Sequence, residues 1–419
     1  MRHVGRGVRL RAVSIALVVL GTGAARAAPT FRRDVAPILY ARCVSCHRPG
    51  QIGPMPLLTY AQVRPWAASI RDEVAARTMP PWRADPRHGA FANDPRLTPD
   101  QIRTIVAWVE ARAPEGGGRA PAPPRFPGDE WNIGRPDAVL AAPHEFLVPA
   151  KGDPELQYFV LDGSWPADRW VTAAEIRPGA RNVVHHATVY MIPGPGGELP
   201  PSAGYGAACD KRAPAPPRKG ALARDYLFSW SPGSPPFTAP AGAARLLPAG
   251  ARLLLEVHYT TNGKPTSDRT RVGLAFAPGP TRARVDTIVA QNRAIVIPPN
   301  EADYRASACV ELARPVTLLE LKPHMHLRGR EMTFTLVTPD GGRELLLAVR
   351  DWDFAWQLSY RLKSPRPLPA GARILVDARY DNSAANKANP APEQEVLWDE
   401  WSSGEMLAGM ITFVVAPDR

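Results

Sequence analysis

The sequence lacks the features that mark nucleic-acid-binding and membrane proteins. It has no basic block with interleaved aromatic residues, which argues against nucleic acid as a partner. Beyond the N-terminus, no run of apolar residues approaches the length needed to span a bilayer. Cysteine is scarce, with four residues in 419. The hydrophobic content of 45% and charged content of 22% are ordinary for a soluble globular protein, and the length leaves room for about two to four domains.

The N-terminus predicts a secretory signal peptide over residues 1–27. Residues 2–11 carry four arginines, residues 12–25 form a short apolar stretch, and residues 25–27 read Ala-Arg-Ala, an A-x-A cleavage site. An uncleaved anchor is the alternative, but the stretch is short for a bilayer. We therefore expect export to a bacterial periplasm, with no stable membrane span after cleavage. Removing the five arginines of residues 1–27 leaves 46 basic against 40 acidic residues, so the formal charge falls from +11 to +6.

Proline is abundant, with 48 residues, which disfavours long helices. Residues 28–113 are nevertheless expected to be helical. Residues 59–62 and 98–101 read as helix start signals, each followed by apolar residues at helical spacing. Residues 114–127 are rich in proline and glycine and predict a linker.

From about residue 130 onward, short strands punctuated by Pro, Gly, Asn and Asp are expected. A β region of this length is long for one antiparallel sandwich and suits two. We place these two β domains at residues 128–285 and 286–419. The expected fold is therefore multidomain: a small all-α domain followed by two all-β sandwich domains.

The motif Cys43-Val44-Ser45-Cys46-His47 matches the C-x-x-C-H attachment signature of c-type haem. In this signature both thiols bond covalently to the haem vinyl groups, and the adjacent histidine becomes an axial iron ligand. A secretion signal before the motif and helices around it predict a small cytochrome c domain with covalently bound haem c. For the distal ligand we favour Met79, a thioether that would raise the haem potential. Met55 is the competitor.

Five histidines of the β region lie in three tight contexts: His185-His186, His258 and His324-x-His326. A lone histidine on an apolar strand is usually a hydrogen-bonded core residue, but this grouping favours metal ligation. His324 and His326 are expected on one face of a strand, where they form a natural chelate. His185 and His186 can share a metal only if their strand bends or bulges, or if different ring nitrogens bind. Imidazole ligands with an added thioether favour copper over zinc, iron or nickel.

The order His-His, Val-His-Tyr, His-x-His and Glu-Met resembles the ascorbate-dependent type II copper monooxygenases, which include peptidylglycine α-hydroxylating and dopamine β-monooxygenase. This resemblance covers roughly residues 130–419. It implies two jelly-roll-like sandwiches, each holding one copper ion, on either side of a solvent-filled cleft. Carried over by position, it implies an electron-relay copper bound by His185, His186 and His258. It also implies an oxygen-activating, catalytic copper bound by His324, His326 and Met406, with Met410 as the alternative thioether.

The chain departs from the peptide-amidating members of that family. Lys322 stands where they carry an arginine, and Ala408 and Met410 stand where they carry an asparagine and a tyrosine. The usual clamp for a peptide carboxylate is thus mostly absent, so a glycine-extended peptide is not the expected substrate. The family's dense disulfide set is also missing. Only Cys209 and Cys309 remain to pair in an oxidising compartment.

Together these features predict an oxidoreductase of the periplasm. It would be a copper monooxygenase that hydroxylates a C–H bond of a small-molecule substrate with O2. A periplasmic donor would supply electrons through the tethered haem. The alternative is a non-catalytic haem/copper electron-transfer or copper-binding protein. A third possibility is that the β region docks a partner and the cytochrome alone is active. A structural or storage site fits less well, because closed sites commonly hold zinc with cysteine.

Overall fold

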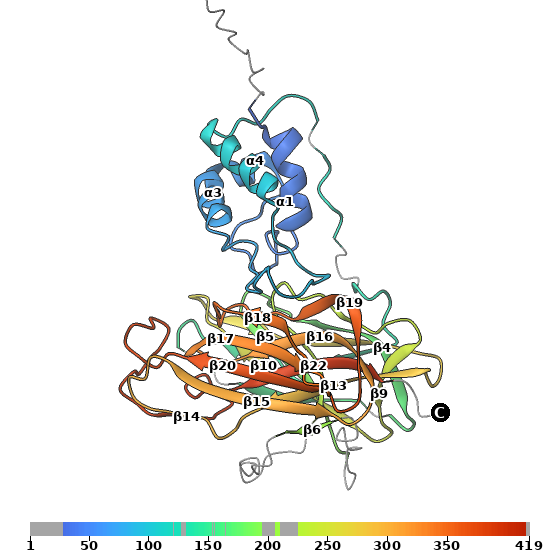
Figure 1. The fold of residues 1–419 in the computed structure, drawn as a ribbon. Coiled ribbons are helices and arrows are strands. Elements are labelled where there is room, and N and C mark those ends of the chain that lie inside the picture. Colours follow the sequence, from blue (N-terminus) through green and yellow to red (C-terminus); the bar gives the residue numbers. More distant parts are fainter. Residues whose placement is uncertain are drawn as a thin grey trace, which may run out of the picture.

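The computed structural model describes residues 28–119, 121–126, 131–152, 154, 156–163, 165–194, 206–209 and 225–415. The expected signal peptide lies outside these residues. Within them, no helix is long and apolar enough to cross a membrane. β-Strands are the main secondary structure of the described chain, and the few helices gather at one end of the β region (Figure 1). The expectation of β-sandwich architecture is confirmed at this level.

The helices of the described residues lie between residues 31 and 110, as expected. They are η1 (Phe31–Val35), α1 (Ala36–Arg42), α2 (Tyr60–Val63), η2 (Arg64–Trp66), α3 (Ala67–Ala75) and α4 (Pro99–Glu110). Capping boxes open α2 at Thr59 and α4 at Thr98, where each threonine oxygen accepts a backbone N–H three residues on. The first and last helices meet through the rings of Phe31 and Trp108, whose centroids are 6.3 Å apart. They enclose a small apolar core of their own.

One nine-stranded sheet runs through the whole β region. Its order is β1 (Ala138–Ala141), β12 (Arg271–Phe276), β4 (Arg169–Arg177), β9 (Ala243–Leu247), β13 (Ala283–Gln291), β22 (Ala408–Val415), β16 (Val316–His324) and β19 (Tyr360–Leu368), with β8 (Phe237–Thr238) paired to β4. Neighbours in this sheet are antiparallel except β9 and β13, which pair in parallel. That parallel pair joins the N-terminal half of the β region to the C-terminal half.

Two further sheets pack on the two halves of this shared sheet. The N-terminal half has β3 (Gln157–Leu161), β10 (Arg252–Tyr259), β5 (Val184–Ile192) and β7 (Asp225–Trp230). The C-terminal half has β18 (Arg343–Val349), β17 (Gly329–Val337), β20 (Arg373–Tyr380), β15 (Tyr304–Leu312) and β6 (Gly206–Ala208). Two short pairs complete the fold: β2 (Phe146–Val148) with β11 (Thr266–Asp268), and β14 (Val296–Ile297) with β21 (Val396–Leu397).

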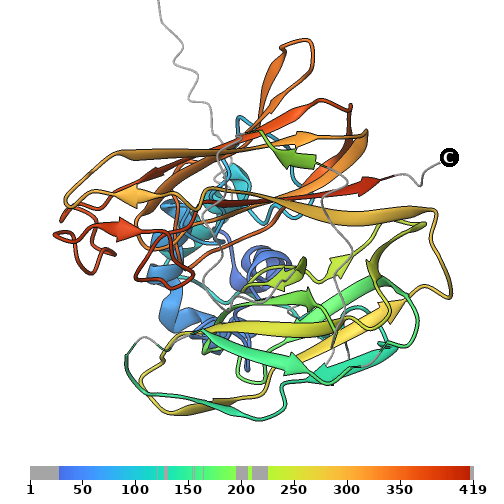
Figure 2. The same cartoon turned by 90° about the horizontal axis from the view of Figure 1, so that it is seen from below.

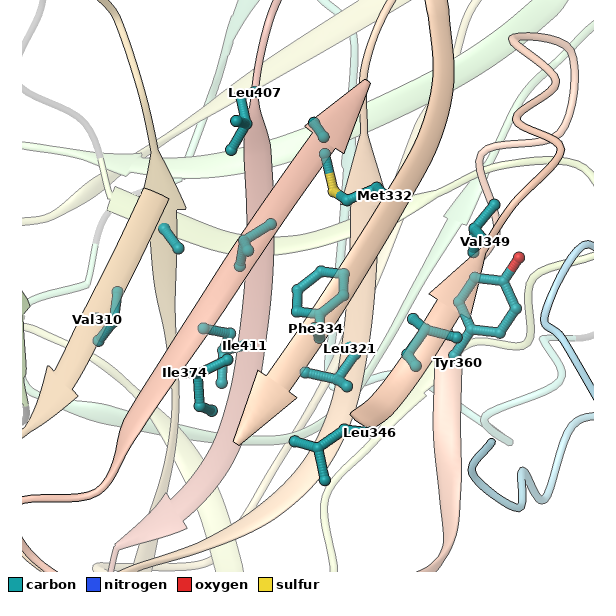
Figure 3. Packing of buried hydrophobic residues seen from close by; sticks show 14 of the residues in the cluster. Val310, Leu321, Met332, Phe334, Leu346, Val349, Tyr360, Ile374, Leu407 and Ile411 are labelled. Atoms are coloured by element: carbon teal, nitrogen blue, oxygen red, sulfur yellow. The ribbon is translucent and has the colours of Figure 1, made fainter. Parts of the chain in front are cut away.

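The β region therefore holds two apolar cores. One core is formed by residues between 140 and 274. The other is formed by residues between 290 and 415 together with Trp82, Ala84 and Phe91. Figure 2 shows the two halves as separate stacks, green to yellow and orange to red. Side chains such as Phe334 and Ile411 fill the second core between its strands (Figure 3). The expected division at residue 285 falls inside β13, so the two cores meet along a continuous sheet.

A disulfide between Cys209 and Cys309 crosses from one half to the other, as the sequence allowed. The two Cα atoms are 5.3 Å apart, and 100 residues separate the cysteines. Next to it, β6 adds to the edge of β15, although β6 belongs in sequence to the N-terminal half. The crosslink and the extra strand both tie a segment of the first half to the second sandwich.

Residues 82–93, which were expected within the helical domain, pack instead on the C-terminal sandwich. Ala84 forms a β-bridge with Val349, and Phe91 forms one with Leu362. Phe91 is buried in the apolar core of that sandwich. This segment anchors the helices to the β region independently of the 114–127 linker.

Candidate functional site

The first histidine set lies on β5 and β10. His186 stands directly opposite His258, while Tyr259 pairs with Val184, so His185 is the extra residue of a β-bulge. The bulge turns both neighbouring histidines toward His258, as metal sharing requires. Ligand nitrogens from the three side chains all lie within 4.8 Å of one another. A possible three-histidine metal site is therefore present.

One nitrogen pair of this set already has the spacing of two ligands on a common metal ion. Nδ1 of His258 is 3.3 Å from Nε2 of His186. Two imidazole nitrogens at about 2.0–2.1 Å from a tetrahedral ion stand about 3.3–3.4 Å apart. His258 thus offers Nδ1 and His186 offers Nε2.

Burial keeps the imidazoles of His186 and His258 neutral. His185, His186 and His258 are 9%, 9% and 6% exposed. Desolvation lowers the pKa of His258 to about 4 and lowers that of His186 well below its ordinary value. Neutral imidazole is the form that binds a metal ion, so no proton must leave these two rings near pH 7.

The second histidine set lies where β16 ends. His324 is the last residue of β16 and His326 follows the strand, with ring centroids 5.2 Å apart. Nδ1 of His324 is 2.7 Å from Oε1 of Gln357, and Nδ1 of His326 is 3.2 Å from the carbonyl oxygen of Gly404. Metal-binding histidines almost always donate their second ring N–H in this way. Both Nε2 atoms therefore remain for a metal, and burial lowers the pKa of His324 to about 3 and of His326 to about 4.

The Glu405-Met406 pair lies beside this second set. Glu405 is fully buried and accepts the backbone N–H groups of His326 and Arg328, at 2.8 and 2.6 Å. Burial raises the pKa of Glu405 to about 7. Met406 is half-buried, and its carbonyl oxygen accepts the Tyr380 hydroxyl at 2.9 Å. The carboxylate thus ties the backbone of the Glu-Met pair to that of the His-x-His chelate.

Met410, the alternative thioether, lies within β22. Its register partner on β16 is Lys322. Lys322 is buried and donates to Ser229 Oγ of β7 at 2.5 Å, across the boundary between the two halves. Burial lowers the pKa of Lys322 to about 8.

The two histidine sets touch each other, which differs from the cleft that the family resemblance implied. The ring centroids of His186 and His324 are 5.9 Å apart, within the range of direct ring contact. Phe354 lies over both sets, with centroids 4.7 Å from His185 and 6.1 Å from His326. No solvent layer fits between rings at these separations, so the sets form one cluster.

The loop at residues 350–359, between β18 and β19, holds this cluster from one side. It supplies Phe354 and the amide of Gln357. Trp352 of the same loop donates its Nε1–H to the carbonyl oxygen of His326 at 3.1 Å. Sequence reasoning missed these residues. Their signal was the aromatic run Trp-Asp-Phe-Ala-Trp-Gln at residues 352–357.

The other side of the 350–359 loop binds the segment after Met79. The guanidinium of Arg83 pairs with Asp351 at 2.7 Å and with Asp353 at 2.8 Å. The loop therefore connects the helical region to both histidine sets through a short chain of contacts.

The Cys43-x-x-Cys46-His47 motif follows α1. Neither cysteine forms a disulfide, so both thiols are available to bond to haem. Nδ1 of His47 is 3.2 Å from the carbonyl oxygen of Met55, which leaves Nε2 for an axial bond. A Cβ on Gly53 would lie 2.7 Å from His47 Nδ1, so only glycine lets this loop close on the imidazole. These features fit covalent haem attachment.

The two candidate distal ligands occupy different places. Met55 sits on the loop that closes on His47 and packs against the helical core. Met79 lies in the turn after α3, three residues before Trp82, which is buried in the C-terminal sandwich. Met79 is thus placed between the helices and the β region.

Arg181 links the haem motif to the first histidine set. Its charge acts on the Cys46 thiol, partly offsetting the larger effect of burial, which raises the thiol's pKa. Arg181 is in the turn that precedes β5, four residues before His185. Arg181 thus lies between the attachment motif and β5 closely enough for its charge to act on Cys46.

Comparison with known proteins gives no family. No protein-family model and no curated protein sequence matches the chain. Among solved structures, an allantoicase covers 57% of this chain and 81% of its own, at 6% identity and a TM-score of 0.16. An infectious bursal disease virus Gx strain structure covers 67% and 72%, at 10% identity and a TM-score of 0.20. The CBM22-1-CBM22-2 tandem domain of Paenibacillus barcinonensis Xyn10C covers 69% and 95%, at 9% identity and a TM-score of 0.13. TM-scores this low carry no argument.

Proposed function

We propose that this protein is a periplasmic copper-dependent monooxygenase whose electrons arrive through a covalently attached c-type haem. The observation that carries the proposal is the cluster of two histidine sets in contact, in a chain that also carries a C-x-x-C-H motif. Neither a haem motif nor a histidine cluster alone would suggest this chemistry. The 350–359 loop, which contacts the histidine cluster and pairs with Arg83, supports a joint function.

In this proposal, the helical residues form a cytochrome c domain and the two sandwiches are jelly-roll-like. Cys43 and Cys46 hold the haem through thioether bonds, and His47 is its proximal ligand. Met79 is favoured as the distal ligand. A bound haem supplies single electrons from a periplasmic donor. The Met55 carbonyl supports the role of His47, because it accepts the Nδ1–H of His47 and so fixes the ring.

In the β region, His185, His186 and His258 hold one copper ion, and His324, His326 and Met406 hold the other. Imidazole and thioether ligands suit copper in both oxidation states, and the described set contains no cysteine ligand of the kind a structural zinc site commonly uses. Bound copper supplies O2 activation. The balanced reaction takes a substrate C–H, O2, two electrons and two protons, and gives an alcohol and water.

The protein's own groups set up this chemistry. Gln357 and the Gly404 carbonyl accept the Nδ1–H groups of His324 and His326 and so fix both ring orientations. Glu405 accepts the backbone N–H groups of His326 and Met406 and so fixes the backbone of Met406 relative to the His-x-His chelate. Phe354 covers the rings and excludes water from that side. A small-molecule C–H substrate remains the expected partner.

One observation favours the second candidate, a non-catalytic haem/copper electron-transfer or copper-binding protein. Four of the five histidines are buried, the two sets are in contact, and Phe354 packs on rings of both, so little of the cluster is open to solvent. An oxygenase needs an open coordination position and space for substrate next to Met406. An electron-transfer protein needs neither.

Oxygen consumption separates the two candidates. The copper-loaded holoprotein is reduced through its haem, and O2 uptake is measured against a panel of small hydroxylatable substrates. Substrate-dependent uptake that yields an alcohol in equal amount supports the monooxygenase. Haem and copper that cycle without substrate-dependent uptake support the electron-transfer protein.

Replacing Gln357 with leucine should weaken copper binding by the His324–His326 set by about 10–100-fold, the usual cost of losing a hydrogen-bond partner of a ligand. Leucine has a similar volume but cannot accept the His324 Nδ1–H. Chelator competition measures the affinity. Gln357→Glu, which restores an acceptor, is the matched control and should retain binding. Equal weakening in both variants would contradict this role.

A further inference from the structure

The five histidine rings lie closer together than two independent copper sites would require. Within the first set, ring centroids lie 5.1–5.3 Å apart, and within the second they lie 5.2 Å apart. Between the sets, the His186–His324 separation is 5.9 Å, only slightly longer. The spacing between sets is therefore nearly the spacing within a set.

The environment of the rings keeps the two sets together. His186 projects from β5 of the N-terminal half, and His324 ends β16 of the C-terminal half, so this contact spans the boundary. Lys322 and Ser229 bridge the same boundary next to it at 2.5 Å. Phe354 packs on members of both sets. The contact is thus part of a packed interface rather than a chance approach of two surfaces.

From this geometry we infer that His185, His186, His258, His324 and His326 form a single dinuclear centre. It binds two copper ions side by side with no solvent layer between them. The inference rests on copper as the metal in the proposed function, but it departs from the separated pair of mononuclear sites that the family resemblance implied. In known two-metal sites the ions are about 3.5–4 Å apart. The His186–His324 contact permits this kind of proximity.

The consequence is that electrons and ligands at one ion would be sensed directly by the other. An electron delivered to the first set would not have to cross a cleft to reach the second. The 350–359 loop gains a specific role as well. Its Phe354 ring closes the dinuclear centre, and its Asp351 and Asp353 hold Arg83 of the helical region.

Magnetic resonance of the Cu(II)-loaded protein tests the inference without reference to activity. Holoprotein with its haem kept oxidised, so that the haem cannot reduce the copper, is loaded with Cu(II). Bound copper is quantified by elemental analysis, and the ferric haem signal recorded before loading is subtracted. The integrated Cu(II) EPR signal is then compared with that count, and the half-field region is recorded. Two adjacent Cu(II) ions couple, so we expect two bound coppers, an integrated signal well below two spins, and a half-field transition.

Two variants make the test specific. His324→Ala removes one ligand of the second set and should leave one copper with a full one-spin signal and no half-field transition. His144→Ala changes an exposed histidine far in sequence from both sets and should leave the coupled signal intact.

Two bound coppers with two full, uncoupled spins would overturn the dinuclear centre and leave the monooxygenase proposal standing. Failure to bind copper would overturn both. A coupled pair in a protein without substrate-dependent O2 uptake would keep the dinuclear centre and overturn the oxygenase.

Discussion

Replacing Met406 with alanine is expected to abolish substrate oxygenation while leaving haem assembly unchanged. In the proposed site Met406 supplies the thioether ligand of the oxygen-activating copper. Loss of a ligand's hydrogen-bond partner alone costs about 10–100-fold, so loss of the ligand itself should lower turnover by more than about 100-fold. The fold should persist, because Glu405 and Tyr380 hold this segment through its backbone.

Two measurements check this outcome. Product formation follows turnover, and X-ray absorption of the Cu(I) protein reports whether sulfur scattering from the ligand is lost. Met410→Ala is the matched control, since Met410 lies four residues on, within β22, opposite Lys322. Full activity in Met406→Ala with loss in Met410→Ala would move the thioether ligand to Met410.

Replacing His47 with alanine is expected to reduce haem-driven turnover to background. This histidine is the proposed proximal ligand, with its Nδ1 held by the Met55 carbonyl and its Nε2 directed to iron. Without it the haem loses an axial ligand, and its spectrum and potential change. The copper ligands lie in the β region and remain intact, so copper content should match that of the unchanged protein.

A small-molecule reductant separates this effect from damage to the copper site. Ascorbate supplied in excess should restore turnover in His47→Ala, because it bypasses the haem. If ascorbate fails to restore turnover although copper is still bound, the helical region is needed for more than electron delivery. If His47→Ala turns over normally without ascorbate, the haem is not the donor.

Local sequence rules predicted the elements well. The capping boxes at Thr59 and Thr98 open helices as expected, because side-chain oxygens satisfy backbone N–H groups in the first turn. The region beyond residue 130 consists of short strands, as the interspersed Pro, Gly, Asn and Asp residues predicted. The structure also contains the expected disulfide between Cys209 and Cys309. The helix starts and strands depend on residues close in sequence. The disulfide could be predicted because only two cysteines remain outside the haem motif.

Features that depend on contacts between residues far apart in the sequence could not be predicted from the sequence. The bulge at His185 arises from the register between β5 and β10, and sequence reasoning gave it only as a condition for metal sharing. The β9–β13 pair that joins the halves, and the packing of residues 82–93 on the C-terminal sandwich, are likewise tertiary. Periodicity in one segment does not specify its partner strand.

The site followed the same pattern. The sequence pointed to five histidines, and the structure gathers all five into one cluster. It did not reveal Phe354 or Gln357, because a loop residue gains meaning only from the surface on which it packs. The expected cleft was a property of the resembled family, and the ring contact between His186 and His324 replaces it here.

Electron transfer from haem to copper within one molecule is the central claim, and an anaerobic mixing experiment tests it most directly. The periplasmic form is loaded with Cu(II), copper per haem is counted, and the haem is reduced without O2. Haem absorbance and the Cu(II) EPR signal are then followed together. The account predicts about two coppers per haem, with haem oxidation and Cu(II) loss at one shared rate that does not depend on protein concentration. A haem that stays reduced beside bound Cu(II), or a rate that rises in proportion to protein concentration, would contradict it.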